Sequence, residues 1–134
     1  MPIAQAWAMG IKTLDTSPNY GFAEQRIAQY LSDNPSKHFN IISKIKSIPQ
    51  SKSEICHAFK NWFTNCPYLK SSNLNSLSVL LHNENHIYDN NIVDHLNELK
   101  FAKKVTYWGA SIYKTDAAKR ALAIHGCSIV ELND

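Results

Sequence analysis

Four side chains that could act together on a small molecule stand at or just beyond the ends of short apolar segments. They are a carboxylate, a phenol, an amine and an imidazole: Asp15, Tyr20, Lys44 and His82. In parallel α/β sheets the carboxyl ends of the strands meet at one edge, where ligands bind and catalysis takes place. We therefore predict that these four side chains surround one cavity.

The chemistry open to such a set is the protonation of an oxyanion as it forms. A free phenol has a pKa of about 10 and is a poor acid at neutral pH, but a neighbouring ammonium favours its ionised form. A carboxylate keeps the ammonium charged and oriented, and an imidazole across the pocket can donate a hydrogen bond to a carbonyl oxygen. The set therefore predicts general acid catalysis on a carbonyl compound.

Each of the four residues also has a structural explanation when it is taken alone. Asp15 precedes a turn and could cap it, while Tyr20 could be a packing aromatic. Lys44 could be solvated, as Lys46 is expected to be, and His82 could be a hydrogen-bonded structural histidine. Their joint placement at strand ends is what favours the catalytic interpretation.

The segments that position these residues alternate between strand-like and helical patterns. Strands are expected over 12–16, 38–45, 77–81, 105–110 and 127–132. Helices are expected over 3–10 and 24–31, and around 55–63, 92–99 and 118–122. Ser51 and Glu54 form a capping-box pattern, and Thr115 or Asp116 is placed to cap the last helix. The alternation predicts α/β architecture with about five parallel strands, in a single domain over 1–134.

Composition excludes several classes of protein. The 134 residues are 44% hydrophobic and 19% charged, which is globular, and the net charge of +3 is spread along the chain. We therefore expect no nucleic-acid partner and no membrane association. Three widely spaced cysteines and the lack of a signal peptide indicate free thiols in a cytoplasmic protein. No metal is expected. His82, Glu84 and His86 follow a strand, and they do not have the H-E-x-x-H order of zinc sites on helices.

Four motifs, in order along the chain, resemble those of the aldo-keto reductase family. The first has an Asp at a strand end followed five residues later by Tyr-Gly, the second ends in Lys, the third in His, and the fourth in Gly-x-Ser. They cover 10–24, 39–44, 77–83 and 105–111. The resemblance implies a (β/α)₈ TIM barrel and an oxidoreductase that reduces an aldehyde or ketone with NADPH, or alternatively with NADH.

The resemblance also assigns roles to residues. Tyr20 would be the proton donor, Asp15 and Lys44 would tune it, and His82 would orient the carbonyl. Two further positions would hold the nicotinamide carboxamide: Ser111 and Glu131. Glu131 is a departure, because a Gln usually stands there, and an ionised carboxylate can accept but not donate a hydrogen bond.

A second departure is length. By the resemblance, one barrel strand would precede residue 1 and two would follow residue 134. About five strands would leave two unpaired edges, since only a closed barrel removes them. We therefore expect a chain that is marginally stable alone, that pairs its edges with another copy, or that is an incomplete or decayed gene product.

Two other functions remain open on the sequence alone. One is a catalytically inactive reductase fragment that acts, if at all, as a binding or interaction module. The other is an unrelated barrel enzyme that uses Lys44 as a Schiff-base amine, which requires an amine of lowered pKa. The sequence does not indicate the substrate, because barrel specificity depends on variable loops.

Overall fold

A computed structural model of the chain describes residues 2–46, 48, 51–68 and 71–133. Its centre is one parallel sheet in the order β1-β2-β3-β4-β5, so each strand lies beside its neighbour in sequence. The strands are β1 (Thr13–Asp15), β2 (Phe39–Ile45), β3 (Leu74–Leu81), β4 (Trp108–Ile112) and β5 (Cys127–Leu132). This confirms the predicted five-stranded α/β architecture.

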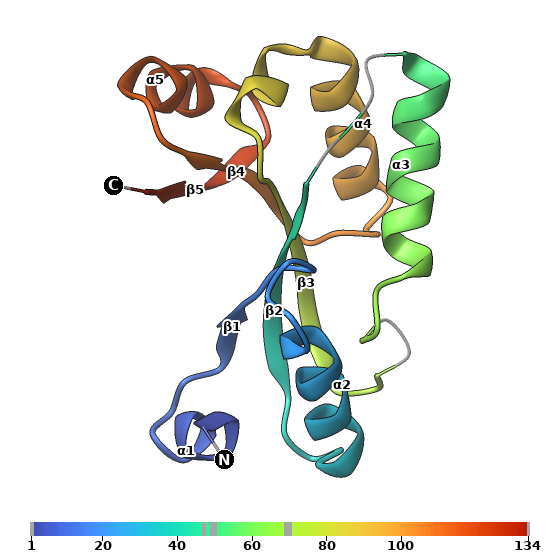
Figure 1. Cartoon of the computed structure of the whole chain (residues 1–134), viewed down its shortest axis with the longest axis vertical. Coiled ribbons are helices and arrows are strands. Elements are labelled where there is room, and N and C mark those ends of the chain that lie inside the picture. The colour runs from blue at the N-terminus through green and yellow to red at the C-terminus, as the bar shows by residue number, and fades with distance from the viewer. Residues whose placement is uncertain (1, 47, 49–50, 69–70, 134) are drawn as a thin grey trace.

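A helix precedes each strand, and from β2 onward it lies in the connection from the strand before. The helices are α1 (Pro2–Ala8), α2 (Ala23–Asp33), α3 (Lys52–Thr64), α4 (Asn90–Phe101) and α5 (Thr115–Ala123), with a short 3₁₀ helix η1 (Glu84–Tyr88) after β3. The sheet curls, and α2, α3 and α4 follow its outer side (Figure 1). The result is a curled half-barrel, as expected for part of a (β/α)₈ fold.

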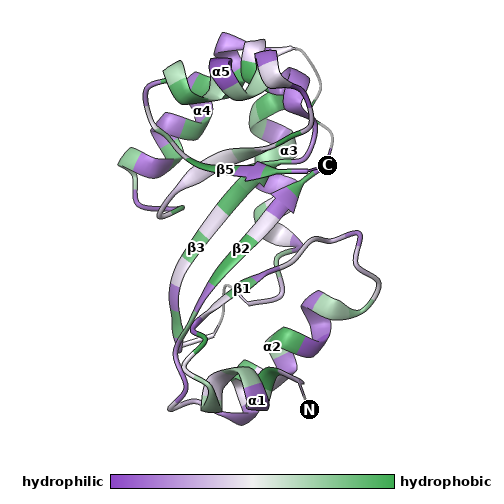
Figure 2. Ribbon diagram, turned by 90° about the vertical axis from the view of Figure 1, so that its left-hand side faces the viewer, coloured by the Kyte–Doolittle hydropathy of each residue, from purple (hydrophilic) through white to green (hydrophobic). Residues whose placement is uncertain are grey.

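Alternation along the strands separates the helix-facing residues from those that face the inside of the curl. Val79, Leu81 and Ala110 pack in a cluster with α3, α4 and α5, and a second cluster joins α1 and α2 to the start of β2. Figure 2 shows the hydrophobic colour along the central strands β2 and β3. Because side chains alternate, the residues between these core positions point into the curl; Lys44 and Ser111 are two of them.

Local polar contacts hold several of these elements in place. Ser51 Oγ accepts a hydrogen bond from the Glu54 backbone N–H, which confirms the predicted cap of α3. The buried Asn73 side-chain amide donates to the carbonyls of Leu31, Asn34 and Lys37 and so closes the end of α2.

Three local predictions were wrong. The strand expected over 77–81 begins earlier, at Leu74. The strand expected over 105–110 begins later, at Trp108, although Val105 is buried and the Thr106 N–H bonds the Leu77 carbonyl. Neither Thr115 nor Asp116 caps α5. The carboxylate of Glu84 instead accepts hydrogen bonds from the backbone N–H groups of Tyr113 and Lys114 (2.8 and 3.1 Å). A cap that comes from 30 residues away leaves no local sequence signal.

The aromatic residues of α3 pack in the core. Phe59 is fully buried, while Trp62 and Phe63 pack against both clusters. Trp108 faces the helix layer, where its Nε1 donates to Asn97 Oδ1 of α4 (2.8 Å). Among the described residues, no helix is both long and apolar enough to cross a bilayer.

Candidate active site

Lys44 is the centre of the site. Its side chain is only 2% exposed, and its Nζ donates a hydrogen bond to Asp15 Oδ1 at 2.7 Å. A second, longer contact goes to the carbonyl oxygen of Thr16 (3.4 Å). β2 places the lysine inside the curl, and β1, its neighbour in the sheet, delivers the aspartate. Two of the four predicted residues are therefore an ion pair.

Tyr20 lies beside this ion pair. Its ring centre is 5.3 Å from Lys44 Nζ, within the range of a cation–π contact. The tyrosine is 53% exposed, so a ligand can reach it from solvent. The turn that carries it begins at Ser17, whose Oγ accepts from the Asn19 N–H, and whose carbonyl accepts from the Tyr20 N–H. The described geometry thus brings three of the four residues together.

Glu131 of β5 is the next charged side chain at the lysine. Its Oε1 lies 3.6 Å from Lys44 Nζ, although β5 and β2 are separated by two strands in the sheet. The curl of the sheet accounts for this contact, because it turns the carboxyl ends of β1 and β5 toward the same interior. The lysine consequently has carboxylates on two sides, one from each edge strand.

The electrostatics of the cluster favour a charged lysine. Burial by itself would lower the pKa of Lys44, but the hydrogen bond and charge of Asp15, with smaller contributions from Glu131 and Tyr20, raise it. The pKa of Glu131 is also raised, first by a hydrogen bond with the Asp15 carboxyl, then by burial and by the charge of Asp15; Lys44 opposes this. The arrangement disfavours a neutral, nucleophilic amine at Lys44.

His82 follows β3 and is anchored by its backbone N–H, which donates to the Ile45 carbonyl (3.0 Å). Its side chain is half-buried, and Nδ1 is enclosed without a hydrogen-bond partner among the described protein groups. No described contact links its ring to Lys44. The structure therefore leaves His82 at the correct strand end but outside the contacts of the lysine cluster.

The two residues expected to hold a nicotinamide are neighbours. Ser111 of β4 and Glu131 of β5 are register partners, so their side chains lie on the same face. The Ser111 hydroxyl accepts from Asn133 Nδ2 (2.8 Å), which leaves its own hydrogen for a carbonyl oxygen, while the Glu131 carboxylate can accept from an NH₂. These groups fit a carboxamide. Asn133 was missed by the sequence analysis, although it shares the two-residue period of Glu131.

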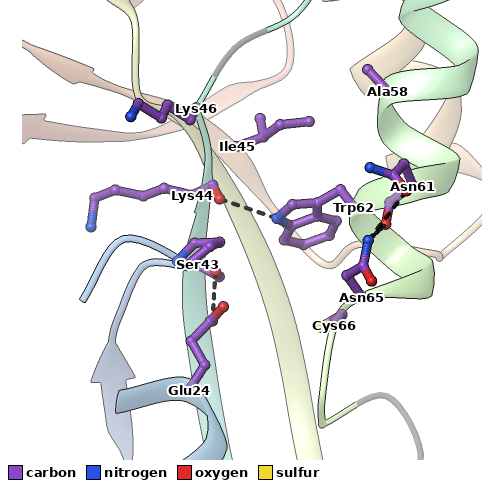
Figure 3. Close-up of a pocket in the computed structure, with 11 residues that line it drawn as sticks. Glu24, Ser43, Lys44, Ile45, Lys46, Ala58, Asn61, Trp62, Asn65 and Cys66 are labelled. Carbon is purple, nitrogen blue, oxygen red and sulfur yellow. Dashed lines mark hydrogen bonds between the residues drawn. The ribbon is translucent and has the colours of Figure 1, made fainter. Parts of the chain in front are cut away.

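A cavity of about 350 Å³ lies on the opposite, helix-facing side of β2. Figure 3 shows the Lys44 side chain extending away from Trp62, whose Nε1 donates to the Lys44 carbonyl (3.1 Å). On the cavity side, Ser43 Oγ donates to the buried carboxylate of Glu24 (2.9 Å). Burial raises the pKa of Glu24, and the Ser43 hydrogen bond and the Lys44 charge partly offset this. The cavity does not contain the lysine ammonium.

The residues near His82 that were weighed as metal ligands have structural contacts. His86 Nε2 accepts from the Ile48 N–H (3.3 Å), and Glu84 caps α5 as described above. Across the described ranges, no group of three or more His, Cys, Asp or Glu side chains is arranged to hold a metal ion. In the part of the chain that the structure describes, Cys56 and Cys127 are free thiols.

Comparison with known proteins agrees with the fold. A solved aldo-keto reductase from Klebsiella pneumoniae, in complex with NADPH, has the same fold (TM-score 0.68, 18% identity). The match covers 96% of this chain and 45% of that chain, so this chain spans less than half of that enzyme's length. No curated protein sequence matches. The sequence model of the aldo/keto reductase family matches residues 2–133. The chain belongs to the aldo/keto reductase family.

Proposed function

We propose that this chain carries the proton-transfer end of an NADPH-dependent reductase that converts an aldehyde or ketone to an alcohol. The observation that carries the proposal is the contact group at Lys44, with Asp15 Oδ1 at 2.7 Å and the Tyr20 ring at 5.3 Å from its ammonium. When bound, NADPH supplies the hydride that reduces the carbonyl carbon. NADH would supply the same chemistry, and the described residues do not discriminate between the two.

Tyr20 is the group that gives the proton. Its phenol hydrogen-bonds the carbonyl oxygen and passes its proton to that oxygen as negative charge develops there. Lys44 stabilises the phenolate that remains, because a buried ammonium close to the ring favours the charged form. Asp15 holds the lysine in place and keeps it protonated. His82 would orient the carbonyl from the end of β3, which requires its ring to contact the ligand directly.

Ser111 and Glu131 would hold the carboxamide of the nicotinamide. The serine hydroxyl donates to the carboxamide oxygen and the glutamate accepts from the amide NH₂, as the register of β4 and β5 allows. These two side chains would fix the carboxamide end of the cofactor at β4 and β5.

The test is Tyr20→Phe in the full chain, with Tyr107→Phe as the matched control. Tyr107 is 48% exposed and has Lys100 Nζ 5.8 Å from its ring, but it precedes β4 at the opposite end of the sheet. We expect Tyr20→Phe to lower kcat for a panel of small aldehydes by about 100-fold to 10,000-fold. NADPH affinity, followed by nicotinamide fluorescence, should stay within about 2-fold, since the phenol hydroxyl acts on the substrate.

Turnover that is unchanged in Tyr20→Phe, or lowered equally in Tyr107→Phe, would reject the role of Tyr20. A wild-type chain that binds NADPH but reduces no aldehyde or ketone would favour the second candidate, a binding or interaction module. That candidate is supported by one observation: in the described sheet β1 and β5 each pair with a single strand. Such edges favour self-association, which sedimentation measures directly.

A Schiff-base role for Lys44 is less well supported. The amine would have to lose its proton to attack a carbonyl, and its two carboxylate neighbours and raised pKa favour the protonated form. Borohydride treatment in the presence of a carbonyl compound should therefore trap no adduct on Lys44.

A further inference from the structure

We propose that Glu131 is a positioning residue that shares the Lys44 ammonium with Asp15, and that carbonyl reduction at Tyr20 is fastest when Glu131 carries a proton. This inference rests on the proposed function of Tyr20, and it assigns Glu131 a task other than holding the cofactor. The neutral glutamic acid leaves the lysine charge for Tyr20, whereas the ionised glutamate competes for it.

The geometry gives Glu131 direct access to the lysine. Its Oε1 is 3.6 Å from Nζ, on the side of the ammonium supplied by β5, while Asp15 approaches from β1 at 2.7 Å. The Asp15 and Glu131 carboxyls therefore lie against the same ammonium. Two carboxylates that share one site repel each other, which favours a proton on one of them. The cluster is therefore arranged to hold one extra proton, which a glutamine at 131 could not carry.

The charge balance decides the direction of the effect. With Glu131 protonated, the negative charge of Asp15 and the positive charge of Lys44 cancel. With Glu131 ionised, the cluster has a net charge of −1 before Tyr20 loses its proton. The phenolate that forms during reduction adds a further negative charge, so ionised Glu131 opposes that step and protonated Glu131 does not.

The size of the effect follows from the distances. Nζ is 3.6 Å from the Glu131 oxygen and 5.3 Å from the Tyr20 ring centre, which places the two within about 9 Å of each other. At an effective dielectric constant between about 20 and 80, one charge at that distance changes the rate of phenolate formation by about 2-fold to 20-fold. The effect is large enough to measure and much smaller than the loss of Tyr20.

Few other described groups can confuse this titration. Asp15 and Lys44 are the charged side chains that act on Glu131, and Tyr20 faces it across the lysine. The neighbouring strand β4 presents Ser111, which does not titrate. α5 packs against β5 from the helix layer, on the side of Val130, and His82 has no described contact with Glu131.

The first experiment needs no activity. Carboxyl ¹³C and lysine side-chain ¹⁵N spectra are recorded against pH for the wild-type chain, for Glu131→Gln and for Glu98→Gln. Glu98 is an exposed glutamate of α4 whose carboxylate lies 3.8 Å from His95 Nδ1, which makes it a charge-matched control. We expect Glu131 to titrate above the ordinary glutamate range, and Glu131→Gln, but not Glu98→Gln, to lower the pKa of Lys44. An ordinary Glu131 titration with an unchanged Lys44 would overturn the proposal.

The second experiment measures kcat and KM for aldehyde reduction against pH. We expect the ratio of kcat in Glu131→Gln to kcat in the wild-type chain to rise by about 2-fold to 20-fold as the pH passes upward through the Glu131 pKa. A ratio that does not change with pH, or a change in KM for NADPH alone, would show that Glu131 does not position Lys44. If no variant is active, the proposed function fails, and the NMR titration still decides whether Glu131 shares the lysine.

Discussion

Gly109 is the point where β4 and β5 approach with no room for a side chain between them. Its Cα lies beside Ile129, and a methyl group there would overlap the backbone carbonyl of that residue. The register of the two strands shifts at this place, because Trp108 pairs with Cys127 whereas Gly109 pairs with Ile129. Two residues further along, the same strand pair aligns Ser111 with Glu131. The glycine therefore controls how closely the strand that carries Glu131 lies to the rest of the site.

The perturbation is Gly109→Ala. The added methyl group would meet the backbone of Ile129, which cannot swing aside as the end of a flexible side chain could. β5 itself must therefore move outward by on the order of 1 Å. Overpacking of this kind costs about 1–3 kcal/mol, and weakening two ladder hydrogen bonds adds about 1 kcal/mol each. We expect a loss of about 3–5 kcal/mol in the free energy of unfolding, measured by urea denaturation. That is a large part of the roughly 5–15 kcal/mol that stabilises ordinary domains.

Gly21→Ala separates steric overlap from backbone conformation. Gly21 has a φ of 58°, but nothing lies within 4 Å of the position a methyl would take. Its replacement should cost only about 1 kcal/mol. Amide exchange should become faster in β5 for Gly109→Ala and stay unchanged there for Gly21→Ala. Equal losses in the two variants, or a loss below about 1 kcal/mol for Gly109→Ala, would refute the reasoning about strand contact.

Two further predictions concern buried polar groups. Asn73→Ala should lower the free energy of unfolding by about 2–3 kcal/mol, because three carbonyls lose their shared donor, while the exposed Asn75→Ala should change it by less than about 0.5 kcal/mol. Glu24 has a pKa raised above its ordinary 4.5. The stability that the protonated Glu24 carboxyl contributes to the folded state is therefore fully present below pH 4.5 and is lost as the pH rises through the folded-state pKa. Glu24→Gln should therefore gain stability relative to the wild-type chain as the pH rises from 4.5 to neutrality. A constant difference across that range would contradict the assignment.

The strand and helix order could be predicted from the sequence because the signals were local. Apolar spacing marked the helices, and short apolar runs marked β2, β3 and β5. The start of β4 was misplaced, because Val105 is buried and the Thr106 N–H bonds β3, although neither residue is part of the strand. Burial and strand pairing are separate properties, and a hydrophobic pattern reports only the first.

Contacts between residues at the ends of adjacent strands could be predicted from the sequence. Contacts between elements that are not adjacent could not. Asp15 and Lys44 were expected together because adjacent parallel strands end at the same edge. The contact between Glu131 and Lys44 depends instead on how far the sheet curls, and the cap of α5 by Glu84 joins two distant segments. Neither contact has a spacing or a pattern that the sequence alone reveals.

The curl and the chemistry of the site depend on each other through Lys44. Its two carboxylate partners come from β1 and β5, which are the two outer strands of the described sheet. Any change that flattens the sheet must therefore separate Glu131 from the lysine, while the Asp15 contact, made within a strand pair, can persist. Since the ammonium would then have one carboxylate instead of two, the loss of curl would be detected as a fall in the pKa of Lys44. The lysine is thus a local reporter of the barrel geometry.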